Sequence, residues 1–154
     1  MKRHSALLSV VLLVLFTGCS ILRNGHKQSI VGTWTGKSLT GYKSATQEWK
    51  ATLILKENLT FTLTYEKNGS GKIEMMGDYS VDLSRRPARI DITNFGFSKG
   101  VTSICCLAIA EFPDKDTMNI CGLFGKCGEV QRPVKFDRKP SDNHQLYLEL
   151  KTIR

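Results

Sequence analysis

The residues best suited to nucleophilic chemistry lie in Gly96-Phe97-Ser98-Lys99-Gly100, which has the G-x-S-x-G pattern. In hydrolases with this pattern the serine sits on a turn between a strand and a helix, and an acid and a histidine follow later in the chain. Here segments typical of β-strands flank the pattern on both sides. We therefore expect Ser98 to lie in an ordinary loop.

The ionisable residues form no recognisable acid–base pair or metal site. The three histidines are far apart in the sequence, at His4, His26 and His144. Three aspartates lie near one another along the chain, at Asp78, Asp82 and Asp91, and we expect them to have structural roles in turns. We predict that the protein is not an enzyme, with no catalytic residue, no metal and no cofactor.

Besides Cys19, the chain has four cysteines, which favour disulfides in an exported domain: Cys105, Cys106, Cys121 and Cys127. Four cysteines allow three connectivities, which the sequence does not separate. Neighbouring residues of a strand point to opposite faces, so Cys105 and Cys106 are not expected to pair with each other. We expect both to bridge to Cys121 and Cys127. A metal site or a redox pair is the alternative, although the spacing matches a zinc site poorly.

The amino-terminal segment has the order of a secretory signal peptide. Lys2 and Arg3 precede an apolar run of 11 residues, Ala6 to Phe16, and the small residues Thr17 and Gly18 follow it. A helix that spans a bilayer needs about 20 residues, so this run is too short for a conventional membrane anchor. We expect residues 1–18 to be removed.

The sequence Phe16-Thr17-Gly18-Cys19 resembles the lipobox of bacterial lipoproteins. The resemblance implies that Cys19 becomes the first mature residue and carries fatty acyl chains such as palmitate, which together hold a protein stably on a membrane. It also implies sorting to the outer membrane, because Ser20 follows the cysteine. An ordinary signal peptide is the alternative. We expect a lipidated residue and flexible tether over 19–29 and one folded domain over 30–154, in the cell envelope.

The formal charge of the chain is +8, and it falls to +6 when Lys2 and Arg3 leave with the signal segment, which contains no acidic residue. The basic residues are spread along the sequence, and nucleic acid is not an expected partner outside the cytoplasm. The densest group, Arg85-Arg86-Pro87-Ala88-Arg89, predicts a solvated turn.

The rest of the chain alternates in hydropathy with a period of two, which indicates β-strands. In Leu59-Thr-Phe-Thr-Leu-Thr-Tyr65, bulky apolar residues alternate with threonines. Gly77 lies inside a similar stretch and predicts a bulge or a sharp bend. No stretch has a sustained helical period. We predict an all-β fold of eight or nine strands with little helix, and favour a small antiparallel up-and-down barrel of about eight strands over a sandwich, because closure removes edge strands.

The sequence Gly32-Thr33-Trp34 resembles the G-x-W signature of lipocalins, and the whole domain resembles small bacterial lipocalin-like domains. The resemblance implies a barrel whose end is closed by Trp34, with an arginine from the end of the last strand packed over it. Arg154 is the candidate for that arginine. The resemblance leaves the ligand open, because loops and interior vary within one fold.

Four aromatic residues are our candidates for lining a ligand pocket: Phe61, Tyr65, Tyr79 and Tyr147. A barrel of eight strands is wide enough either to hold one small ligand or to be filled by side chains, and the sequence leaves both open. We expect a lipid-anchored envelope protein that binds a small apolar or amphipathic ligand. The alternative is a non-enzymatic interaction or structural protein of the envelope, with a filled core and a protein partner.

Overall fold

A computed structural model of the chain describes residues 29–42, 45–66, 71–97, 100–101, 104–138 and 145–153. Side chains are described outside 40–47, 97 and 100–101. The described residues form nine strands and no helix. The strands are β1 (Gly32–Tyr42), β2 (Ala45–Leu55), β3 (Thr60–Glu66), β4 (Lys72–Asp82), β5 (Ala88–Phe97), β6 (Gly100–Val101), β7 (Ile104–Asp114), β8 (Thr117–Lys126) and β9 (Gln145–Thr152).

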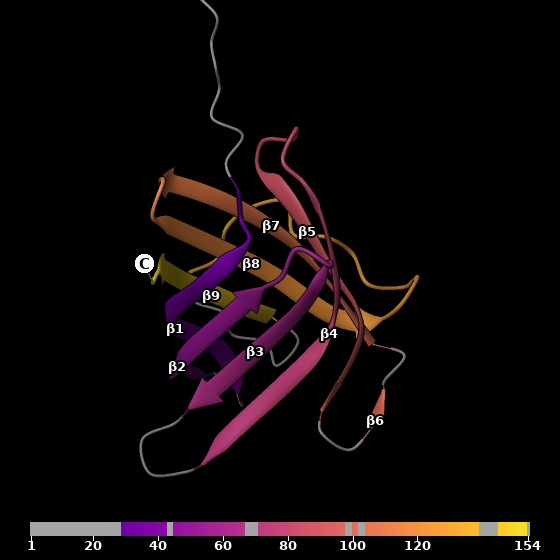
Figure 1. Cartoon of the computed structure of the whole chain (residues 1–154). Coiled ribbons are helices and arrows are strands. Elements are labelled where there is room, and N and C mark those ends of the chain that lie inside the picture. Colours follow the sequence, from indigo (N-terminus) through magenta and orange to yellow (C-terminus); the bar gives the residue numbers. More distant parts are fainter. Residues whose placement is uncertain are drawn as a thin grey trace, which may run out of the picture.

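The strands form a closed antiparallel barrel (Figure 1). The sheet order is β4-β3-β2-β1-β9-β8-β7-β5-β6, and β4 also pairs with β5. Eight strands therefore close on themselves in an up-and-down order, and the two-residue β6 pairs with the end of β5. The predicted all-β barrel of about eight strands is confirmed.

The up-and-down order gives the barrel two different ends. One end, the turn end, carries the chain before β1 and the turns after β2, β4 and β7. In Figure 1 the chain before β1 and the β4–β5 turn both lie toward the top. The other end, the loop end, is where β1, β3, β5 and β8 finish. Every strand of the closed barrel is hydrogen-bonded to a neighbour on each side. A ligand can therefore reach the interior only through one of the two ends.

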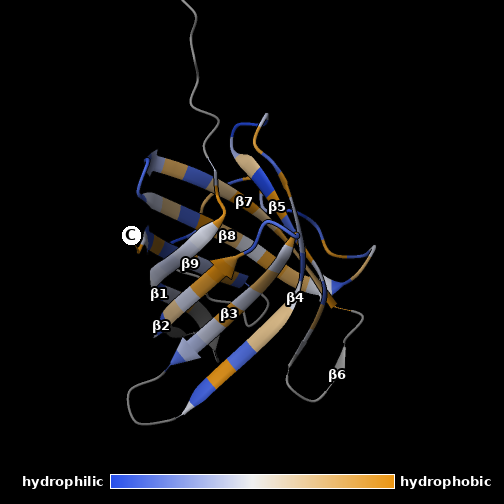
Figure 2. Ribbon diagram, in the orientation of Figure 1, coloured by the Kyte–Doolittle hydropathy of each residue, from blue (hydrophilic) through white to orange (hydrophobic). Residues whose placement is uncertain are grey.

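The hydropathy alternation explains why these segments are strands. Along β3 the inward positions Phe61 and Leu63 are 1% and 0% exposed, and Thr62 between them faces outward. The colours of Figure 2 change in short bands along β7 and β8 for the same reason. One apolar face thus covers the core, and the other face meets solvent or the chain that crosses it.

Glycines allow two close approaches between strand backbones. A Cβ on Gly36 would collide with the carbonyl oxygen of Glu149 in β9. A Cβ on Gly77 would lie 2.7 Å from Cα of Phe95, where the β4–β5 register shifts. Asn94, in the same irregular stretch, has a positive φ of 50°. The bulge expected around Gly77 is confirmed: Asn94 and Phe95 of β5 stand opposite Gly77 alone, so β5 carries one extra residue there.

Residues 127–138 follow β8 and cross the outside of the barrel, and we call them the outer strap. Phe136 of the strap packs on a small outer cluster formed by Ile109, Cys121 and Tyr147. A disulfide joins Cys127, the first strap residue, to Cys105 in β7. The strap therefore buries outward-facing residues of β7, β8 and β9 that an ordinary barrel would leave exposed.

The expectation of two disulfides is half right. The Cys105–Cys127 bridge is present, whereas Cys106 and Cys121 are free and buried. Cys106 belongs to the core inside the barrel, and Cys121 belongs to the outer cluster under the strap. The second bridge was wrong because the sheet itself separates these two side chains.

Candidate ligand site inside the barrel

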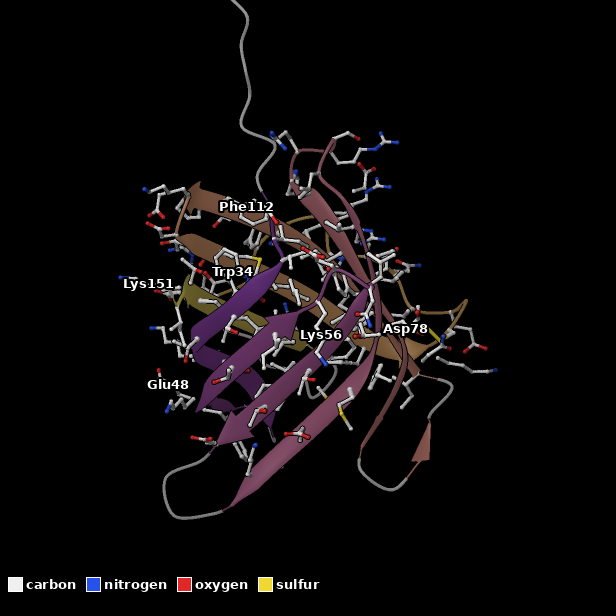
Figure 3. The ribbon with its side chains drawn as sticks, in the orientation of Figure 1. Trp34, Glu48, Lys56, Asp78, Phe112 and Lys151 are labelled. Carbon is white, nitrogen blue, oxygen red and sulfur yellow. A yellow bond between two sulfur atoms is a disulfide. The ribbon has the colours of Figure 1, made fainter. Side chains whose placement is uncertain are left out.

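Side chains and the chain before β1 close the turn end of the barrel. Trp34 is 3% exposed, and its indole Nε1 donates a 2.8 Å hydrogen bond to the carbonyl oxygen of Ile30. The phenol of Tyr79 donates a 2.8 Å hydrogen bond to the carbonyl oxygen of Lys56 in the β2–β3 turn. Figure 3 shows Trp34 inside the barrel and Lys151 at its periphery. The indole of Trp34 and the phenol of Tyr79 are thus both hydrogen-bonded within the protein at this end.

The candidate pocket residues lie in three different places. Phe61 and Tyr79 are buried in the core toward the turn end, at 1% and 3% exposure. Tyr147 is 1% exposed on the outer face of β9, under the outer strap, and so does not line the interior. Of the four, Tyr65 alone lies near the loop end, two positions from the start of the β3–β4 connection.

Several other residues named from the sequence lie outside the described residues. They are Cys19, Arg154, Ser98 and the three histidines. Of the predicted closing pair Trp34 and Arg154, the structure describes Trp34, which is buried at the start of β1.

Inward-facing apolar residues remain partly exposed at the loop end. Ile73 pairs with Tyr65 across β3 and β4 and is 43% exposed. Ile104 lies two residues before the inward-facing Cys106 and is 38% exposed. Phe124, which pairs with Cys106, is also only partly buried. These three side chains, on β4, β7 and β8, form an apolar patch beside Lys126 that we call the apolar rim, and covering it would remove apolar surface from water.

Polar groups lie deeper in the same half of the interior. Ser38 is fully buried, and its Oγ has no hydrogen-bond partner among the described residues. Tyr65 lies close enough to Ser38 for the hydroxyl to lower its phenol pKa, although the contact lacks hydrogen-bond geometry. A buried hydroxyl without a partner is costly, so this position favours a group that completes it.

We call the region around Ser38, Tyr65 and Cys106 the floor of the interior. Burial keeps its two titratable side chains, Tyr65 and Cys106, in their neutral forms. Burial is the main cause that raises the pKa of Tyr65, and Cys106 adds to the shift. Burial likewise raises the pKa of the Cys106 thiol to about 12, with smaller contributions from Cys121 and Asp91 in the same direction and from Arg132 in the opposite one. None of the buried side chains of the core cluster carries a charge, whereas Lys126, which pairs with Ile104 at the loop end, does. The floor therefore suits an uncharged polar group.

Within the described part of the chain, no group of three or more His, Cys, Asp or Glu side chains is arranged to hold a metal ion. The same residues contain no helix long and apolar enough to span a bilayer.

Sequence reasoning missed Ser38, Ile73 and Ile104. Each lies on a strand face fixed by its register, and the alternation of Ser38 with its neighbours in β1 was the available signal. Comparisons with protein-family models, curated proteins and solved structures gave no match to this chain. The functional interpretation therefore depends on the geometry of the barrel.

Proposed function

We propose that the barrel binds a small, uncharged amphipathic molecule through its loop end and performs no covalent chemistry. The observation that carries this proposal is the unpartnered, fully buried Oγ of Ser38 beneath an apolar rim that includes the partly exposed Ile73 and Ile104. The apolar part of the ligand would cover the rim. Its polar group, a hydroxyl or carbonyl, would meet Ser38 and Tyr65.

The absence of charge on the buried side chains of the core cluster supports a neutral polar group beside Ser38 over an anionic one. The charged Lys126 lies further out, opposite Ile104, and is paired with Glu129. An ionised carboxylate buried without a partner is strongly destabilised. We therefore expect a long-chain alcohol to bind more tightly than the fatty acid of the same length at neutral pH.

The test is titration with a fluorescent long-chain alcohol, using two arginine substitutions on the same strand. Ile73→Arg places a charge on the inward-facing rim and is expected to weaken binding by about tenfold or more, which is about 1.4 kcal/mol. Met76 is 51% exposed on the outward face, so Met76→Arg is the matched control and should bind like the parent protein. Equal affinity in all three proteins would contradict the proposal.

We also propose that the chain is a lipoprotein of the bacterial cell envelope, attached through acylated Cys19 and sorted to the outer membrane. The supporting features are the signal-like first 18 residues, the lipobox-like sequence and Ser20. A Cys19→Ala protein is expected to leave the membrane fraction. Membrane association that persists in this variant would contradict the lipid anchor.

A second candidate function is interaction with another envelope protein through the outer surface. Two observations favour it: the half of the interior at the turn end is filled by buried side chains, and a disulfide fixes the outer strap on the barrel wall. This role predicts that crosslinking in cells captures a defined partner and that no ligand copurifies.

A further inference from the structure

A cleft of about 560 Å³ lies outside the barrel, between the β4–β5 turn and the outer strap. Its lining includes four arginines, Arg85, Arg86, Arg89 and Arg132, together with two prolines, Ile109 and Val134. The arginines come from segments more than forty positions apart in the sequence. The fold therefore gathers them, and the cleft is separate from the barrel interior, because the sheet lies between the two.

The charge of the cleft is only half compensated. Arg85 pairs with Asp82 at 3.4 Å, and Arg132 pairs with Asp91 at 2.5 Å. Within the described part of the chain, the guanidinium of Arg89 has no ion pair or hydrogen bond, and no acid pairs with Arg86. No carboxylate lines the cleft itself. Two guanidinium groups are thus left to attract an anion.

Hydrogen bonds hold parts of this lining in place before any ligand binds. Arg86 Nη1 donates to the carbonyl oxygens of Leu83 and Arg85, both at 2.9 Å. Arg132 Nη1 donates to the carbonyl oxygen of Ala108 at 2.6 Å, which ties the strap to β7. The disulfide at Cys127 fixes the beginning of the strap, five residues before Arg132. Less ordering is therefore required when an anion binds.

The chemistry of the lining indicates the class of ligand. Guanidinium groups present paired N–H donors that match the oxygens of a phosphate. The cleft has the size of a small-molecule site, which exceeds what a bare phosphate fills. Val134 is 92% exposed at its margin, and Ile109 supplies buried apolar surface. We propose that this cleft binds the phosphate group of an organic phosphate ester, with part of the organic portion against Val134.

Such a phosphate ester is either a free molecule or the headgroup of a lipid, and two probes distinguish these sources. Residues 20–154, which contain the whole closed barrel and its core, are titrated with glycerol 3-phosphate by calorimetry. The same protein is sedimented with phosphatidylcholine vesicles with and without phosphatidic acid. Binding of glycerol 3-phosphate indicates a free ester, and binding confined to the phosphatidic acid vesicles indicates a lipid headgroup.

Arg89→Gln is the test variant, because this exposed side chain has no described partner whose loss would affect folding. It is expected to weaken binding by about tenfold. Arg138→Gln makes the same charge change on the strap outside the cleft, at a side chain 71% exposed, and should leave affinity unchanged. Val134→Glu places a negative charge at the margin and is expected to weaken binding as well.

Two outcomes would overturn the proposal. One is that neither probe binds the parent protein. The other is that Arg138→Gln weakens binding as much as Arg89→Gln, which would indicate attraction to the overall positive charge instead of recognition in the cleft. Neither result bears on the long-chain alcohol site inside the barrel, which is tested by variants of β4 and β7 residues outside the cleft.

Discussion

Loss of the Cys105–Cys127 disulfide should destabilise the barrel mainly through the unfolded chain. The bridge closes a loop with a sequence separation of 22 residues, which contains most of the β7–β8 hairpin. The chain-entropy relation for a loop of this length gives about 3 kcal/mol at 25 °C. For a domain of this size, that corresponds to a decrease of about 10 °C in Tm.

The assay is equilibrium unfolding of residues 20–154 in guanidinium chloride, with and without reductant. Reductant is expected to lower the free energy of unfolding of the parent protein by about 3 kcal/mol. The control is the double variant Cys105→Ser with Cys127→Ser, which should begin at the lower stability and not respond to reductant. A change below about 1 kcal/mol in the parent protein, or an equal response in the control, would refute this reasoning.

Further predictions concern the free thiols and the barrel wall. Without reductant, a thiol reagent at pH 8 should detect no thiol in folded residues 20–154 and two after unfolding, namely Cys106 and Cys121, whereas zero or four would contradict the single bridge. The pKa of Cys106 is raised to about 12 from an ordinary 9.0, so this thiol should leave the free energy of unfolding unchanged below pH 9 and lower it between pH 9 and 12. Measured by unfolding at several pH values, this decrease should be smaller in Cys106→Ala. An unchanged pH profile in the variant would contradict the prediction. Gly36→Ala should lower stability by about 3 kcal/mol in thermal unfolding, because the new methyl group meets the facing backbone of β9, and wild-type stability would argue against this close approach. Trp34→Phe removes the donor to the carbonyl oxygen of Ile30 and should cost about 1–3 kcal/mol in chemical denaturation, while a neutral result would show that this hydrogen bond does not stabilise the turn end.

The fold was predictable because its local signals agree with its tertiary arrangement. The alternation that ends at Tyr65 predicted β3, and the glycine at position 77 predicted the irregularity found opposite Phe95. The same alternation already indicated that Tyr147 faces outward, since its neighbours Leu146 and Leu148 face the core. Its choice as a pocket residue relied on its aromatic character instead of this pattern.

The site and the outer surface could not be predicted in the same way. The strap has no strand periodicity, and its burial of Cys121 depends on contacts with β8 and β9 that only the folded chain creates. The pairing expected between the remaining cysteines failed because the register places Cys106 inside and Cys121 outside. Arg132 and Arg89 line one cleft only because the strap crosses β5 and β7.

The most direct test of the central proposal, that the barrel binds an uncharged amphipathic molecule, is native mass spectrometry of residues 20–154 after export in the original host. We expect a discrete additional mass that disappears on denaturation and corresponds to a neutral molecule with an apolar chain. The same preparation of Ile104→Arg should lack it. A bare protein mass in the parent preparation would contradict ligand binding and favour a function at the outer surface.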